Sequence, residues 1–148
     1  MDTVDKETRS QMMAGIRSCN TKPEVLVRKA LHARGFRFRI NVKKLPGSPD
    51  IVLKKYNAII FVHGCFWHGH NCRLFKAPST RTKYWSDKIR GNRARDSKNI
   101  KALSAMGWRI CIVRECAIRK AARRPVLSGL AVRLVTWIRS SNTRMEIE

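Results

Sequence analysis

The sequence predicts a single α/β domain, in which a central mixed sheet is flanked by helices. At 148 residues the chain is long enough for one hydrophobic core and too short for two ordinary domains. Apolar runs typical of strands occur between segments with helical spacing, without the strict alternation that a purely parallel sheet requires. Two of these runs are so close in sequence that they can pair only as an antiparallel hairpin.

The first two elements are expected to be helices. Residues 6–17 have an apolar side that includes Met12 and Ile16. A second helix should follow, because Pro23 suits a first helical turn and Gly35 suits the position after the last one.

Three strands are expected next. Residues 36–40 alternate apolar and basic side chains, as a half-buried strand does. Residues 50–53 and 58–62 are apolar runs joined by only four residues, 54–57, which predicts the antiparallel hairpin.

The second half of the chain is expected to contain a long helix, a strand and a last helix. The long helix spans about residues 82–105 and ends before Gly107. Residues 108–113 form an apolar run typical of a strand. Residues 126–139 carry leucine and isoleucine at helical spacing, which indicates an amphipathic helix.

The charge of the chain favours a nucleic-acid partner. Lys and Arg number 32 against 10 Asp and Glu, so the formal net charge is +22. This charge is spread along the chain, which favours a folded surface that binds a polyanion over a disordered basic arm. The alternative is a highly soluble surface without such a partner, but solubility rarely needs so much charge of one sign.

No targeting or membrane segment is expected. The N-terminus lacks a basic region followed by an apolar stretch, and no apolar run is long enough to cross a bilayer. We therefore expect a cytoplasmic chain with no membrane partner. Five cysteines, an odd number, argue against a disulfide framework. Cys111 lies within an apolar run and is expected to be a core thiol, and Cys19 has no obvious role.

Histidine and cysteine are concentrated in residues 63–72, which hold three of the four histidines. Cys65, His70 and Cys72 form a C-x4-H-x-C cluster, and thiolate and imidazole are the ligands of structural Zn2+. Cys116 is the best fourth ligand, because it follows a strand that could bring it near. The alternative is a set of buried cysteines beside a surface histidine.

The hairpin predicts a second cluster. Its turn places Asp50 opposite residues 61–63, so Asp50 and His63 should lie at the same end, with His68 in the following loop. In the long helix, Asp96 interrupts an apolar stripe and is expected to pair with His68. The alternatives are that Asp50 only begins a strand and that Asp96 pairs with Arg93 or Arg95 at the rim of the stripe.

Several motifs resemble one family. Residues 63–68 read HGCFWH and are followed by His70 and Cys72, and residues 45–50 read LPGSPD. Together with residues through Cys116 they resemble the very short patch repair endonucleases, bacterial enzymes that nick DNA at T:G mismatches left by deamination of 5-methylcytosine. The resemblance covers most of the chain.

This resemblance implies a fold similar to that of restriction endonucleases and two kinds of metal. It implies Zn2+ at Cys65, His70, Cys72 and Cys116. It implies Mg2+ at Asp50, aided by the main-chain carbonyl of Val62. His63 and His68 match the active-site histidines, Asp96 matches the acid that supports the second of these, and Glu24 matches an N-terminal active-site acid. By its spacing alone, Glu24 is only an acid in the first turn of a helix.

The resemblance also implies DNA contacts. Phe66, Trp67 and Trp85 match aromatic residues that wedge into the base stack beside the mismatch, whereas the alternative for the first two is packing over the zinc loop. Met13 matches a residue that inserts from the other groove, within an arm of residues 1–20 that contacts DNA. Apart from the resemblance, Lys88, Asn92 and Arg93 are candidates for the base-edge contacts that read the flanking sequence.

Two positions depart from the family pattern. Val62 stands where a threonine is familiar, and Ser48 stands where an arginine is usual. We expect one endonuclease domain over residues 1–148 that acts as a monomer on double-stranded DNA near the nucleoid, with repair proteins as further partners. The alternatives are a sequence-specific endonuclease without mismatch dependence and an inactive, zinc-stabilised DNA-binding module.

Overall fold

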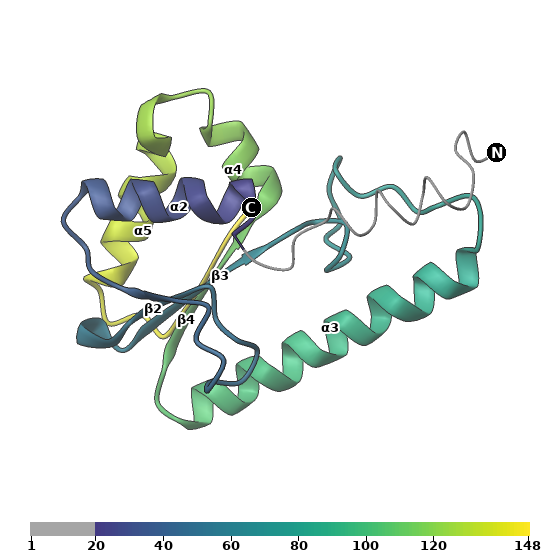
Figure 1. Cartoon of the computed structure of the whole chain (residues 1–148), viewed down its shortest axis with the longest axis horizontal. Helices are drawn as coiled ribbons and strands as arrows, with labels where there is room; N and C mark the ends of the chain where they lie inside the picture. Colours follow the sequence, from purple (N-terminus) through teal and green to yellow (C-terminus); the bar gives the residue numbers. More distant parts are fainter. Residues whose placement is uncertain (1–19) are drawn as a thin grey trace.

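A computed structural model describes residues 20–148 and places a five-stranded mixed sheet at the centre of the molecule (Figure 1). The strand order is β1-β2-β3-β4-β5. The first three strands are antiparallel neighbours, and β3, β4 and β5 are parallel neighbours. Their bounds are β1 Arg39–Ile40, β2 Ile51–Leu53, β3 Ala58–His63, β4 Arg109–Arg114 and β5 Arg144–Ile147.

Helices cover both faces of the sheet (Figure 1). The long helix α3 lies on one face, and α2, α4 and α5 lie on the other. The bounds are α2 Lys22–Ala33, α3 Thr82–Ala105, α4 Glu115–Ala121 and α5 Ser128–Ile138. Short 3-10 turns, η1 Lys54–Tyr56 and η2 Pro125–Leu127, join β2 to β3 and precede α5.

The central strand β3 holds the two faces together. All six of its residues are buried, which explains its continuous apolar sequence. Ile60 and Val62 pack into the core beneath α2 and α5, whereas Ile59 and Phe61 pack into the core beneath α3. This division follows from the two-residue period of a strand, whose successive side chains point to opposite faces.

The sheet register brings several polar residues to the C-terminal end of β3. Ile51 lies opposite Ile60, so Asp50 lies beside the last residues of β3. In the parallel pair, His63 lies opposite Arg114, and α4 begins at the next residue. The C-terminal ends of β3 and β4 therefore lie side by side at the same end of the sheet.

The predicted elements are largely confirmed. The mixed α/β architecture, the antiparallel hairpin and the 82–105 helix are all present. The strand predicted over residues 36–40 is wrong in length, because only residues 39 and 40 pair with β2 while Phe36 turns into the core. The last helix begins at Ser128, after a 3-10 turn, rather than at residue 126.

Two elements had no prediction. Helix α4 spans only seven residues, too few to show a helical period, and β5 is a four-residue strand at the sheet edge. The predicted helix over residues 6–17, Met13 and Cys19 lie outside the described residues. Within residues 20–148, no helix combines the length and apolar character that a membrane span requires.

Candidate active site and metal centre

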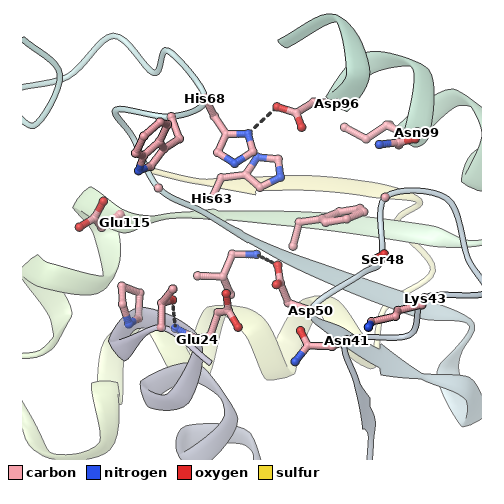
Figure 2. A pocket seen from close by; sticks show the side chains of 18 residues that line it. Glu24, Asn41, Lys43, Ser48, Asp50, His63, His68, Asp96, Asn99 and Glu115 are labelled. Atoms are coloured by element: carbon pink, nitrogen blue, oxygen red, sulfur yellow. Dashed lines mark hydrogen bonds and ion pairs between the residues drawn. The ribbon is translucent and has the colours of Figure 1, made fainter. Parts of the chain in front are cut away.

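A cavity of about 800 Å³ opens at the end of β3. Its walls come from the start of α2, the loop before β2, the end of β3 and the middle of α3 (Figure 2). Its chemistry lies in carboxyl and imidazole side chains, because Glu24, Asp50, His63, His68, Asp96 and Glu115 all line it. The predicted active-site residues are therefore brought together in one place.

Asp50 is held beside the end of β3, as the hairpin register predicts. Its Oδ2 accepts a hydrogen bond of 2.6 Å from the backbone N–H of Val62. Burial raises the pKa of Asp50 to about 7, against the lowering effect of the Val62 hydrogen bond, and the negative charge of Glu24 raises it further. The Asp50 carboxyl therefore loses its proton only when the pH rises above this value or when a bound cation stabilises the carboxylate.

Glu24 is both a helix-start residue and a buried wall of the pocket. Only 4% of its surface is exposed. Its Oε2 accepts hydrogen bonds from the Asn20 N–H at 2.8 Å and from Arg28 at 3.0 Å. Thr21 caps the helix by accepting from the Glu24 N–H at 3.4 Å. Because of these contacts Glu24 has a fixed place in the wall of the pocket that Asp50 also lines (Figure 2).

His68 and Asp96 form a pair across the pocket from Asp50 (Figure 2). Nδ1 of His68 donates to Oδ2 of Asp96 over 2.5 Å. Asp96 therefore pairs with the histidine rather than with Arg93 or Arg95, the alternative partners on its own helix. Since Nδ1 carries the shared proton, Nε2 is the basic nitrogen of His68.

His63 stacks on His68. The two ring centroids are 3.8 Å apart and the planes differ by 1°. His63 is 5% exposed, and burial, followed by the positive charge of His68, lowers its pKa to about 3. Its Nδ1 has no hydrogen-bond partner among the described residues. His63 is therefore a neutral ring stacked on His68.

The four predicted zinc ligands also come together. The ligand atoms of Cys65, His70, Cys72 and Cys116 all lie within 4.8 Å of one another. Nδ1 of His70 is 3.7 Å from Sγ of Cys116. Zn–S bonds of about 2.3 Å and Zn–N bonds of about 2.0 Å in a tetrahedron give a similar separation.

The thiols themselves fit a metal. Burial raises the pKa of Cys65 to about 12, so a cation is needed to hold it as a thiolate near neutral pH. The backbone N–H of Cys116 already points at the Cys65 sulfur, at 3.4 Å. Cys111, in contrast, is buried in the core as predicted.

Aromatic rings surround the loop that carries His68. Phe66 lies 5.2 Å from Trp67 and 5.4 Å from Trp85, and the two tryptophans are 5.8 Å apart. All three are partly exposed, so packing over the loop and contact with an outside partner are compatible. Nδ2 of Asn92 donates to the Trp67 carbonyl at 2.8 Å, whereas Lys88 is exposed and lies 6.0 Å from the Trp67 ring.

Sequence reasoning missed some residues of the pocket. Glu115 accepts hydrogen bonds from the Cys65 N–H at 3.4 Å and from Arg119 at 2.9 Å, so it ties the start of the metal loop to α4. Its place directly before Cys116 was the available signal. Asn41, Lys43 and Asn99 line the far end of the pocket, and nothing in their local sequence sets them apart (Figure 2).

The chain combines a mixed α/β fold with an acid–histidine pocket, a Cys/His cluster and a strongly basic sequence. This combination is the one expected of an enzyme that cleaves DNA. The family model described as "DNA mismatch endonuclease Vsr" matches residues 1–74. The chain is 42% identical over 147 residues to DNA mismatch endonuclease Vsr of Escherichia coli K12, covering 99% of this chain and 94% of that protein. This chain therefore belongs to the Vsr family of DNA mismatch endonucleases.

Type II nicking enzymes are also similar. V.XorIIP of Xanthomonas oryzae is 50% identical over 117 residues, which cover 79% of this chain and 86% of that enzyme. V.NmeAIP of Neisseria meningitidis is 46% identical over 121 residues, covering 82% of this chain and 86% of that enzyme. The partner of this chain is thus DNA, and its activity is that of an endonuclease.

Proposed function

We propose that this chain is a Mg2+-dependent endonuclease that nicks one strand of duplex DNA at T:G mismatches and so initiates very short patch repair. The observation that carries this proposal is the His68–Asp96 pair, which lies in the same pocket as the Asp50 carboxyl. Membership of the Vsr family supports the mismatch as the target.

Asp50 and the main-chain carbonyl of Val62 would hold Mg2+. The fit rests on Asp50 itself, a buried carboxyl with a raised pKa and a second acid, Glu24, in the wall of the same pocket. A cation there would relieve the repulsion between the two carboxylates. When bound, Mg2+ stabilises the negative charge that develops on the scissile phosphate and the leaving oxygen.

His68 would act as the general base. Its Nε2 accepts a proton from the attacking water, and Asp96 stabilises the imidazolium that results. His63 stays neutral because of its lowered pKa, so its role is to contact the phosphate as a hydrogen-bonding ring and not as a charged group. Glu24, fixed by Asn20 and Arg28, would orient water or the metal at the acidic side of the pocket.

Cys65, His70, Cys72 and Cys116 would hold a structural Zn2+. With four ligands the site is closed, which is typical of structural zinc. Its effect would be to fix the loop that carries the aromatic residues and His68. A restriction-endonuclease-like core and a single domain over residues 1–148 are part of the same proposal.

The DNA would lie across the pocket and the aromatic rings. Phe66, Trp67 and Trp85 would wedge beside the mismatch, where unstacking costs less than at a paired base. Met13, in an arm of residues 1–20, would insert from the other groove. Lys88 is the better candidate for a base or phosphate contact, because one amide proton of Asn92 is already donated to the loop.

We further propose that the enzyme works as a monomer, since one active site meets one strand. The setting would be the bacterial cytoplasm, at the nucleoid, where repair proteins could act with it. These proposals follow from the nature of the substrate.

The test is nicking of end-labelled duplexes that contain one T:G pair in varied flanking sequences, beside matched C:G duplexes, with and without Mg2+. We expect a Mg2+-dependent nick beside the mismatched T and none in the C:G control. Equal cutting of both would support a sequence-specific endonuclease without mismatch dependence. Tight binding without cutting would support an inactive DNA-binding module. The first explanation to test would then be Val62, which stands where a threonine is familiar in the family.

A further inference from the structure

The outer side of His70 has a partner that the four-ligand cluster does not include. Nε2 of His70 lies 2.6 Å from Oε2 of Glu148, while Nδ1 faces the cysteine sulfurs. The His70 side chain is 12% exposed and that of Glu148 is 62% exposed. One ring nitrogen is thus directed at the metal cluster and the other at a carboxylate.

Strand β5 brings Glu148 to this position. β5 is parallel to β4, with Ile147 opposite Val113, and Ile147 is 1% exposed in the main core. Glu146, two residues before Glu148, forms a 2.6 Å ion pair with Arg114 at the end of β4. A buried side chain and an ion pair therefore fix the strand directly before Glu148.

The contact has a defined chemical consequence for His70. A carboxylate can only accept a hydrogen bond, so the proton resides on Nε2 and the lone pair of Nδ1 is free for a metal. Negative charge on the N–H side also makes the ring a stronger electron donor, and such partners of ligating histidines contribute substantially to metal affinity.

We propose that Glu148 is a positioning residue of the metal centre, which selects Nδ1 of His70 as the ligand atom and slows the release of Zn2+. This inference rests on the proposed zinc site and extends it from four ligands to a fifth residue on another element. The Glu148–His70 contact also connects strand β5, at the sheet edge, to the loop that carries His68. The backbone N–H of His70 donates to the Cys65 carbonyl at 2.9 Å, and the backbone N–H of His68 donates to the Gly64 carbonyl at 3.1 Å. Fixing the position of His70 therefore restrains the turn that carries His68.

The experiment compares the zinc-loaded protein with three variants, Glu148→Ala, Glu148→Gln and Asp87→Ala. Zinc content is measured first, and then the rate at which Zn2+ passes to a chromogenic chelator at fixed pH and ionic strength. We expect Glu148→Ala to release Zn2+ about 10-fold to 100-fold faster than wild type. Glu148→Gln keeps an acceptor but loses the charge, so its rate should fall between those two.

Asp87→Ala is the control, because it removes one negative charge from an exposed residue of α3 that belongs to no metal-ligating group among the described residues. Glu146 does not serve this purpose, because its carboxylate also lies within 4.8 Å of the ligand atoms of His70 and Glu148. Asp87→Ala should release Zn2+ at close to the wild-type rate. Release from Glu148→Ala at the wild-type rate, or equal acceleration by Asp87→Ala, would overturn the role of Glu148 while leaving the zinc site intact. Wild-type protein without stoichiometric Zn2+ after zinc loading would contradict the zinc site itself. If Glu148→Ala does not fold, release of Zn2+ from Glu148→Gln at the wild-type rate would overturn the proposal.

Discussion

Two aspartates in one pocket differ in their surroundings, and this difference supports the separate roles proposed for them. Asp50 is buried beside the end of β3, and its pKa is raised to about 7. Asp96 is paired with Nδ1 of His68, so its charge has an immediate partner. Environments that separate the behaviour of neighbouring acids are a general means of dividing acid, base and metal-binding functions.

The raised pKa of Asp50 predicts a pH-dependent stability. The pKa of this carboxyl is about 7 in the folded state against an ordinary value of 3.8, so the folded state binds the proton more tightly than the unfolded chain does. The resulting stabilisation is fully present below the ordinary pKa and is lost as the pH rises through the folded-state pKa. Between these two values, the free energy of unfolding falls by at most about 1.4 kcal/mol for each pH unit.

Asp50→Asn should therefore be more stable than wild type at pH 7 without added Mg2+, because it avoids burying a carboxylate. Urea unfolding between pH 4 and pH 8 measures the difference. The gap between the variant and wild type should widen as the pH rises, and Mg2+ should narrow it by stabilising wild type alone. A gap that does not change with pH would show that burial of the Asp50 charge has no energetic effect.

Asp96→Asn tests the histidine pair. The amide can occupy the same space, but it cannot stabilise a positive charge on His68 as a carboxylate does. We expect single-turnover nicking of a T:G duplex to slow by about 100-fold to 10,000-fold, with DNA binding nearly unchanged. Asp87→Asn, an exposed acid on the same helix, is the control and should nick normally. Equal rates for both variants would remove the pair from the mechanism.

At the scale of elements, α3 shows why part of the site could be predicted. Its stripe at helical spacing runs through Trp85, Ile89, Asn92, Asp96, Ile100 and Leu103. Ile89, Ile100 and Leu103 are buried, while the two polar residues of the stripe bond to the loop after β3. A polar residue within an otherwise apolar stripe needs a partner, so the sequence predicts that such a partner exists.

The anchoring of α3 predicts the cost of a core truncation. Leu103 is fully buried in the core between α3 and the sheet. Leu103→Ala should lower the free energy of unfolding by about 2–5 kcal/mol, because it removes apolar contacts and leaves a cavity. Met106→Ala, at a residue that is 57% exposed, should change it by less than about 0.5 kcal/mol. Denaturant unfolding of both variants measures this, and similar losses would contradict the packing.

Other parts of the site were not predictable, for identifiable reasons. The position of Asp50, in contrast, was predictable from the hairpin, because a short turn determines the antiparallel register. Glu148 reaches His70 only through β5, and four residues at a sheet edge carry too little periodicity to be recognised. Lys43 and Asn99 both line the pocket because the loop before β2 packs on α3, where Gly47 lies against Asn99. Such long-range loop contacts leave no local pattern in the sequence.

Across the molecule as a whole, positive charge should govern the binding of DNA. A formal net charge of +22 favours contact with DNA phosphates, and each neutralised phosphate releases counterions. Lys88 is exposed on α3 beside the aromatic rings, whereas Lys55 lies in η1 at the opposite end of β3. The two lysines therefore separate the proposed DNA face from the remaining basic surface.

Lys88→Ala should lower the slope of log affinity against log salt concentration by about 1, the change expected for one lost phosphate contact. Lys55→Ala should leave the slope unchanged. Fluorescence anisotropy with a T:G duplex at several salt concentrations gives both slopes. If only Lys55→Ala altered the slope, the DNA would have to lie on a different face of the molecule.

In the proposed mechanism, DNA is cut at T:G mismatches in the pocket that contains Asp50, with Mg2+ as the cofactor. This mechanism is tested by the single-turnover nicking rates of wild type and Asp50→Asn on T:G and matched C:G duplexes, with Mg2+ present. Binding to each duplex is measured in parallel. We predict that wild type nicks the T:G duplex beside the mismatched T and leaves the C:G duplex intact, while Asp50→Asn binds both but cuts neither. Nicking of the T:G duplex by Asp50→Asn at the wild-type rate would show that cleavage does not need the Asp50 carboxyl.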